Sequence, residues 1–148
     1  METKITKMEL SDLEAISNII STDFDDFWNI DNLKSEITNP NSVCITAKIF
    51  ENEIIGFASV WFGYKEAHIT NIVTKKNCRN QGVATTLLSN LIDICIQKID
   101  VESITLEVRE LNVAAIKLYE KFSFKKIGIR KNYYSGNENA IIMTKKLK

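Results

Sequence analysis

Residues 71–84 read NIVTKKNCRNQGVA, a strand-like run followed by a basic polar loop and then by small residues. From position 82 to position 99, apolar residues recur at the i, i+3, i+4, i+7 spacing of a helix that is buried on one face. This is the strongest helical periodicity in the chain. The segment therefore predicts a strand, a loop and a long amphipathic helix in succession.

The loop and the helix start have the chemistry of a phosphate site. The first turn of a helix exposes backbone N–H groups without partners inside the helix, and it carries the positive end of the helix dipole. Arg79 adds a guanidinium suited to phosphate oxygens, and Gly82 and Ala84 let the backbone approach an anion closely. The segment has neither GxGxxG nor GKS/T. The residues favour a pyrophosphate cradle, and an ordinary surface loop before a helix remains the alternative.

Strand and helix patterns alternate on both sides of this segment. Upstream, Ser11 and Glu14 predict a capping box that opens a helix through Leu13, Ile16, Ile19 and Ile20. Strands are also expected at 3–8, 43–50, 54–62 and 67–74, and a short helix at 31–38. Downstream, strands are expected at 103–109, 127–134 and 140–145, with a helix at 113–122 capped by Asn112. The order predicts a mixed α/β fold with a sheet of roughly seven strands and about four helices.

Two polar residues stand out in the downstream elements. In LEVR, alternation places Leu106 and Val108 on one face and Glu107 and Arg109 on the other. A carboxylate in mid-strand is unusual, and it is explained either by pairing with Arg109 or by a role as a general base. Tyr119 lies in the following helix, where it fits either a core aromatic or a functional phenol.

Composition describes an ordinary globular chain. The 148 residues are 45% hydrophobic and 26% charged, with one proline and five glycines, so we expect a single domain over 1–148. The formal net charge is zero, which favours neither nucleic acid nor anionic lipid as a partner. No apolar run approaches the length of a membrane helix, and the N-terminus lacks a signal-peptide pattern. We therefore expect a cytoplasmic protein without a membrane partner.

Cysteine and histidine usage predicts no metal site. Cys44, Cys78 and Cys95 lie far apart, and His68 is the single histidine, which is too few ligands for a usual zinc site. Cys44 and Cys95 are expected as small apolar residues. Cys78 precedes Arg79 and could be a nucleophile, but no base is placed for it. His68 is expected to be structural.

The block LEVRELNVAAIKLYEKFSFKKIGIRKNYY, followed by AIIM, resembles the C-terminal half of the GNAT acetyltransferases. Within that family it is most similar to the ribosomal-protein-alanine N-acetyltransferases (RimI type). The family's acetyl-CoA motif, Q/R-x-x-G-x-G/A, is matched by Arg79, Gly82 and Ala84. The likeness runs from about Ala67 to Met143. It implies a central, mostly antiparallel sheet that is splayed in the middle and flanked by helices, with acetyl-CoA between the fourth and fifth strands.

The resemblance also implies roles for individual residues. The implied acetyl-CoA contacts are Ile72, Val73, Thr74, Arg79, Asn80, Gln81, Gly82, Val83, Ala84, Asn112 and Tyr119. Glu107 resembles the family's general base, Tyr119 its general acid, and the backbone N–H of Val73 or a neighbour its oxyanion partner. We expect the Tyr119 phenol to give up its proton more readily if it is buried near cationic groups. Trp28, Tyr133 and Tyr134 resemble substrate-pocket residues, and a paired strand edge is the alternative for the two tyrosines.

The implied reaction is acetylation of a protein's N-terminal α-amine, with an N-terminal alanine of a ribosomal protein as the suspected acceptor. An α-amine has a pKa of ~7.7–8.0, whereas a lysine at ~10.4 demands more of a base. Alternatively, the acceptor is a lysine or a small-molecule amine such as a polyamine or aminoglycoside, which acidic residues at Asp23, Asp25 and Asp26 would favour. A non-catalytic CoA-binding module is a further alternative. We expect a monomer or weak dimer.

Three positions depart from the family pattern. Ser123 replaces the usual glycine at the end of the helix, where a left-handed cap favours glycine. Phe27-Trp28 stands where Pro-Trp is usual, which puts the identity of the acceptor in doubt. Lys75-Lys76 replaces a common Asp-Pro pair and adds positive charge beside the expected phosphates.

Overall fold

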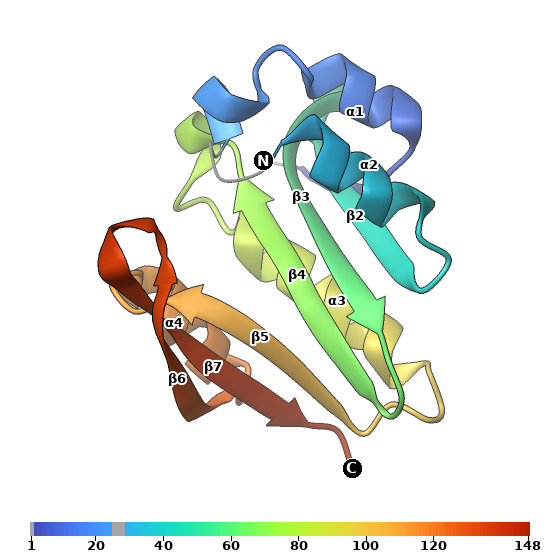
Figure 1. The fold of residues 1–148 in the computed structure, drawn as a ribbon. Helices are drawn as coiled ribbons and strands as arrows, with labels where there is room; N and C mark the ends of the chain where they lie inside the picture. Colours follow the sequence, from blue (N-terminus) through green and yellow to red (C-terminus); the bar gives the residue numbers. More distant parts are fainter. Residues whose placement is uncertain (1, 25–28) are drawn as a thin grey trace.

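A computed structural model describes residues 2–24 and 29–148 of the chain (Figure 1). Four residues with predicted roles lie outside the described residues. Trp28 was expected in the substrate pocket, Phe27 departs from the family pattern, and Asp25 and Asp26 were the acidic residues of the alternative acceptor site.

Seven strands form one sheet in the order β1-β2-β3-β4-β5-β7-β6. The strands are β1 (Lys4–Lys7), β2 (Ser42–Ile49), β3 (Glu53–Phe62), β4 (Glu66–Thr74), β5 (Ser103–Arg109), β6 (Lys125–Tyr134) and β7 (Glu138–Lys146). Neighbouring strands are antiparallel except β4 and β5, which run parallel. The predicted mixed, mostly antiparallel sheet is therefore confirmed.

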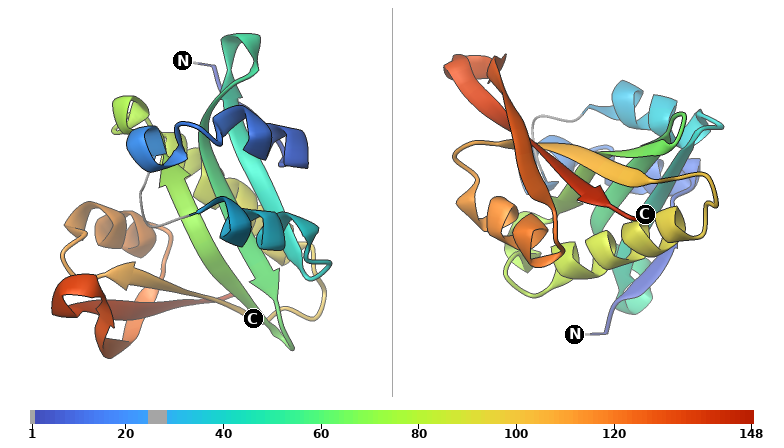
Figure 2. Two further views of the ribbon diagram at one scale, coloured as in Figure 1. Left: turned by 45° about the horizontal axis from the view of Figure 1, so that its top comes forward. Right: turned by 90° about the horizontal axis from the view of Figure 1, so that it is seen from below.

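The four main helices cover the two faces of the sheet. They are α1 (Leu10–Ile16), α2 (Ile30–Thr38), α3 (Val83–Ile96) and α4 (Val113–Lys121). Helices α1 and α2 lie on one face, and α3 and α4 lie on the other (Figures 1 and 2). Each face buries its own apolar cluster: Leu87, Leu91 and Leu106 belong to the cluster under α3, and Leu13 and Phe57 to the cluster under α1 and α2. Among the described residues, no helix has the length and hydropathy needed to cross a bilayer.

The first helix does not begin as predicted. Its capping box uses Glu9 and Asp12 instead of Ser11 and Glu14, and the Glu9 N–H donates to Asp12 Oδ2 at 2.8 Å. Asp12 Oδ1 also lies 2.8 Å from Lys48 Nζ, so an ion pair from the distant strand β2 holds the carboxylate at the helix start. The spacing of residues around the helix start cannot predict that Lys48 is the partner of Asp12.

The same helix ends earlier than the apolar spacing predicts. Helix α1 stops at Ile16, and the Ser17 hydroxyl donates to the Glu14 carbonyl at 3.0 Å, which competes with further helical bonds. A short π-helical turn, Ile20–Phe24, follows. Ile20 is still buried in the cluster under α1, so the predicted apolar face is kept although the helix is broken.

Strand β4 carries an extra residue at Thr70. Ser59 of β3 pairs with Asn71 and its neighbour Val60 pairs with Ile69, so Thr70 is a bulge between them. Before the bulge, Ile69 packs in the α3 cluster, whereas Val73 after the bulge packs in the α1–α2 cluster. Because side chains alternate along a strand, Asn71 shares the α1–α2 face with Val73.

Candidate functional site

The parallel pairing of β4 and β5 stops halfway along the two strands. It runs from Glu66 opposite Ser103 to Ile69 opposite Leu106, and the strands then diverge (Figure 1). Residues 70–74 of β4 and 107–109 of β5 therefore flank an opening in the sheet. An unpaired strand edge presents N–H and C=O groups to any extended ligand that lies along it.

A pocket of about 590 Å³ opens at this divergence. It is lined by Ile72, Val73, Thr74, Arg79, Asn80, Gly82, Val83, Ala84, Thr85, Asn112, Ala114, Ala115, Leu118 and Tyr119. Every residue predicted to contact acetyl-CoA lines it except Gln81. Thr85, Ala114, Ala115 and Leu118 were missed. Helical spacing could have found Ala115, because it lies one turn before Tyr119 on α4.

One end of the pocket fits a phosphate group. Helix α3 starts behind Gly82, whose φ of +82° is left-handed, and no side chain caps the helix. The first-turn amides of α3 are therefore without a capping side chain, and a Cβ at Gly82 would meet nothing within 4 Å. Uncapped amides at the positive end of a 14-residue helix form a site for an anion.

Arg79 ties the loop to two other segments. Its Nη2 donates to the Phe24 carbonyl at 3.1 Å, and its Nε donates to the Thr74 carbonyl at 3.4 Å. A guanidinium has five N–H donors, so two bonds do not exhaust it. The same contacts hold the end of β4 beside the start of α3. The donors present at this end suit the diphosphate of acetyl-CoA.

The basic pair after β4 lies to one side of this pocket. Lys75 and Lys76 line a smaller hollow with Thr22, Asp23 and Asn77. Lys75 Nζ is also 3.3 Å from Glu53 Oε2. Because Lys75 already has an anionic partner, its charge is partly neutralised before any phosphate binds.

Glu107 has one paired and one unpaired carboxylate oxygen. Oε1 lies 3.6 Å from Arg130 Nη2, and Oε2 is buried without a hydrogen-bond partner among the described atoms. The alternative explanation, a pairing of Glu107 with Arg109, does not hold, because Arg109 Nη1 bonds Glu138 Oε1 at 2.9 Å. The partners of both charges come from β6 and β7, which the local pattern of β5 cannot reveal.

The two predicted pocket tyrosines lie close to this carboxylate. Burial raises the pKa of the Tyr133 phenol, and the nearby negative charge of Glu107 raises that pKa further. Burial and then the charge of Glu107 also raise the pKa of Tyr134. The two rings meet edge to face with centroids 5.0 Å apart. The β6–β7 hairpin thus brings both phenols near the Glu107 carboxylate.

Tyr119 lies on the pocket side of α4, where its ring packs edge to face on Phe124 at 5.9 Å. Burial, with a smaller contribution from Tyr134, raises the pKa of Tyr119 to about 12. Easier proton release would require cationic neighbours, but burial and another phenol are the causes of this shift. Tyr119 therefore keeps its proton throughout the neutral range.

The cysteines do not contribute reactive groups to the pocket. Cys44, Cys78 and Cys95 are all buried free thiols. Cys44 and Cys95 pack in the apolar clusters, which confirms that they are small core residues. Burial raises the pKa of Cys95 to about 12. Cys78 Sγ donates to Asn77 Oδ1 at 3.3 Å. A buried Cys78 without a placed base does not fit a nucleophile.

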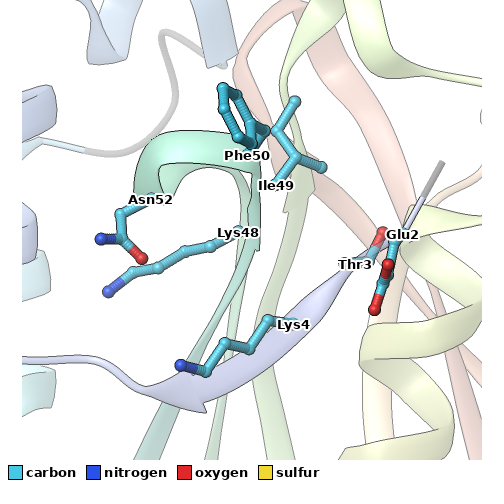
Figure 3. A pocket seen from close by; sticks show the side chains of 7 residues that line it. All are labelled: Glu2, Thr3, Lys4, Lys48, Ile49, Phe50 and Asn52. Carbon is cyan, nitrogen blue, oxygen red and sulfur yellow. The ribbon is translucent and has the colours of Figure 1, made fainter.

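A second hollow, of about 570 Å³, lies at the other edge of the sheet (Figure 3). It is lined by Glu2, Thr3, Lys4, Lys48, Ile49, Phe50 and Asn52. None of these residues was predicted to be functional, and Lys48 is already paired with Asp12. Its rim includes Phe50, which is 85% exposed at a turn. The pocket between β4 and β5 is therefore the candidate active site.

Comparison with known proteins identifies the family of this chain. The model of the acetyltransferase (GNAT) family matches residues 13–124. A Bacillus subtilis protein, provisionally named a ribosomal protein bS18-alanine N-acetyltransferase, is 34% identical over 147 residues, which cover 97% of this chain and 96% of that protein. The ribosomal protein bS18-alanine N-acetyltransferase of Escherichia coli is 34% identical over 143 residues and 94% of each chain.

The structural similarity to a known protein also extends over nearly the whole chain. The crystal structure of the ribosomal-protein-S18-alanine N-acetyltransferase from Escherichia coli superposes with a TM-score of 0.89 at 30% identity. The superposition covers 99% of this chain and 95% of that one. The likeness thus includes the N-terminal helices as well as the segment from Ala67 to Met143.

Proposed function

The chain belongs to the GNAT family of acetyltransferases, and we propose that it transfers the acetyl group of acetyl-CoA to the N-terminal alanine of ribosomal protein bS18. One observation carries the proposal: a pocket lined by Tyr119 opens between the diverging strands β4 and β5, in a chain that matches alanine N-acetyltransferases along nearly its full length. The acceptor is a ribosomal protein, so we place the enzyme in the cytoplasm, as a single domain acting as a monomer or weak dimer.

Acetyl-CoA is proposed to bind along the opening in the sheet. The uncapped start of α3 and Arg79 would hold the diphosphate, and the edge of β4 at residues 72–74 would pair with the extended pantetheine arm. Asn112 and Tyr119 would contact it from α4. The acetyl thioester supplies the electrophilic carbonyl carbon. No metal is invoked in this scheme.

Glu107 is proposed to free the amine. An α-amine with a pKa of ~7.7–8.0 is mainly ammonium at pH 7, so it must lose a proton before it can attack. Glu107 Oε2 is the available acceptor, because it is buried and without a partner, whereas Oε1 faces Arg130. The pairing with Arg130 also restricts the rotation of the carboxylate and keeps Oε2 in one direction.

Tyr119 and the β4 backbone are proposed to serve the departing sulfur and the developing oxyanion. As the C–N bond forms, the carbonyl oxygen takes up negative charge, which the N–H of Val73 or a neighbour would stabilise. As the C–S bond breaks, Tyr119 gives its proton to the sulfur. The nitrogen releases its second proton to solvent, and a phenol with a pKa of about 12 readily regains one.

The acceptor is proposed to enter on the face that carries Glu107. Tyr133 and Tyr134 of β6 lie near Glu107, whose charge contributes to the raised pKa of both phenols. Their rings would pack against the first residues of the acceptor peptide. We propose that this face selects a free N-terminus, because an α-amine of pKa ~7.7–8.0 gives up its proton to a carboxylate more readily than a lysine amine of pKa ~10.4 does.

The test is thiol release from acetyl-CoA against a panel of acceptors. The panel holds peptides that begin with alanine, serine, methionine or an acidic residue, the same peptides with blocked N-termini, and a set of polyamines. We expect turnover only with free N-termini, and fastest with alanine. Turnover with polyamines or with lysines of blocked peptides would overturn the proposed acceptor, and absence of turnover with every amine would overturn the proposed enzyme.

A further inference from the structure

Three buried polar side chains form a chain across the α1–α2 face of the sheet. Ser59 Oγ of β3 donates to Cys44 Sγ of β2 at 3.3 Å, and Asn71 Nδ2 of β4 donates to Ser59 Oγ at 3.0 Å. The three residues are 5%, 1% and 6% exposed for Cys44, Ser59 and Asn71. Buried polar groups on a sheet face are costly unless they are satisfied, so a chain of this kind needs an explanation.

The direction of this chain sets the orientation of the Asn71 amide. A hydroxyl has a single hydrogen, and that of Ser59 is given to the Cys44 sulfur. Ser59 can therefore only accept from Asn71, which requires the Nδ2 side of the amide. The Oδ1 side is turned away from Ser59. Oδ1 is buried, and it has no hydrogen-bond partner among the described atoms.

Asn71 and Glu107 occupy matching places on the two strands that diverge. Ile69 lies opposite Leu106, and both pack in the α3 cluster. The next residue of β5, Glu107, therefore faces the α1–α2 side, and the bulge at Thr70 puts Asn71 on that same side. The Glu107 carboxylate and the Asn71 amide thus each present a buried oxygen without a partner on one face at the opening.

We propose that Asn71 Oδ1 and Glu107 Oε2 together bind the α-amine of the acceptor, each through one N–H. This inference rests on the proposed function and names a binding residue for it. An amide oxygen accepts hydrogen bonds and never donates them, so Asn71 Oδ1 keeps its N–H after Glu107 has taken a proton from the ammonium group and does not occupy the nitrogen lone pair that attacks the thioester carbon. The amine supplies the donors that the two buried oxygens need.

The neutral amide at position 71 suits this task better than a second carboxylate. An anion beside an ammonium group stabilises the charged form and raises its pKa. Glu107 must accept a proton from the amine, and a second anion would oppose that transfer. Asn71 binds the N–H without holding the proton, and the chain to Cys44 keeps its oxygen facing the amine.

Two substitutions of Asn71 test the inference. Asn71→Leu removes the acceptor atom and is expected to raise KM for an alanine-led peptide about tenfold, with KM for acetyl-CoA unchanged. Asn71→Asp keeps the shape and adds a charge, which raises the pKa of the bound amine. Because kcat reports groups in the enzyme–substrate complex, its acid limb is expected to move about one pH unit higher.

The controls separate binding from folding. Asn90→Asp alters an amide on α3 whose Nδ2 donates to the Thr86 carbonyl at 2.8 Å, away from the pocket lining, and it is expected to leave both constants and the pH profile unchanged. Ser59→Ala removes the group that orients Asn71. It is expected to raise the acceptor KM by a smaller factor, about threefold, without moving the acid limb.

The outcomes distinguish the two proposals. If the wild-type enzyme turns over the peptide but Asn71→Asp keeps the wild-type pH profile, the inference is wrong and the proposed function stands. An equal rise in both KM values in Asn71→Leu would likewise assign Asn71 a structural role. If the wild-type enzyme does not acetylate free N-termini, both proposals fall. Asn71→Asp is nearly isosteric and carries the test if Asn71→Leu does not fold.

Discussion

Arg130 Nη2 lies 3.6 Å from Glu107 Oε1, although β6 and β5 are not neighbours in the sheet. Strand β7 runs between them, and the Arg130 side chain reaches over it. The contact divides the carboxylate into an oxygen that faces a cation and an oxygen that is buried without a partner. A carboxylate divided in this way has one oxygen held in place and one available for a proton, which is the basis of the first prediction.

Glu107→Gln is expected to lower kcat by about 10²–10⁴-fold at pH 7 and by much less at pH 9.5. Above its pKa of ~7.7–8.0 the acceptor amine loses its proton without help, so the base becomes dispensable. Thiol release measured from pH 6.5 to 9.5 checks this. Glu120→Gln, on the exposed side of α4, is the matched control. An identical loss at every pH would exclude Glu107 as the base.

Tyr119→Phe is expected to slow kcat by about 10²–10⁴-fold and to leave acetyl-CoA affinity nearly unchanged. Burial raises the pKa of this phenol to about 12, so it stays protonated from pH 6.5 to 9.5 and its loss should cost the same factor throughout. Calorimetric titration with acetyl-CoA and kcat profiles provide the two readouts. Tyr64→Phe, at an exposed tyrosine, is the control. A loss that shrinks toward alkaline pH would contradict a protonated donor.

Arg79→Ala is expected to raise KM for acetyl-CoA about tenfold to hundredfold, with the acceptor KM little changed, because charge-assisted hydrogen bonds to the diphosphate are lost. The arginine also holds the Thr74 and Phe24 carbonyls, so Arg79→Lys is measured beside it. Lysine keeps the charge and should recover part of the affinity. Lys76→Ala should change KM less than twofold. Equal effects of Arg79→Ala and Lys76→Ala would argue against a specific phosphate contact.

Ser123→Gly is expected to stabilise the protein by about 1 kcal/mol and to leave kcat unchanged. Ser123 has a φ of +71°, a left-handed conformation that strains residues with a Cβ but not glycine. For a chain of this length the melting temperature should rise by about 2–4 °C. Asn132→Gly, at a φ of +55°, should gain less because asparagine tolerates this region. A fall in melting temperature for Ser123→Gly would mean that the serine side chain makes a compensating contact.

Local sequence patterns predicted the elements around the site well. The strand at 103–109 coincides with β5, and the predicted Asn112 cap is present, since Asn112 Oδ1 accepts from the Ala115 N–H at 3.1 Å. The alternation that predicts the strand and the side chain that caps the helix both depend only on residues close together in the sequence. The predicted capping box at Ser11 and the alternative pairing of Glu107 with Arg109 were both wrong, because the observed partners come from distant segments. Asp12 pairs with Lys48 and Glu107 pairs with Arg130, and both partners lie far away in the chain.

The sequence by itself determined the order of strands and helices, the small residues at the start of α3 and the positions of Glu107 and Tyr119, because periodicity and capping are local properties of the chain. Only the tertiary structure decided where β4 and β5 part, that a bulge at Thr70 turns Asn71 to the face of Glu107, and that burial holds the Tyr119 proton. Strand register and burial depend on segments brought together by folding. A local sequence pattern therefore cannot predict them.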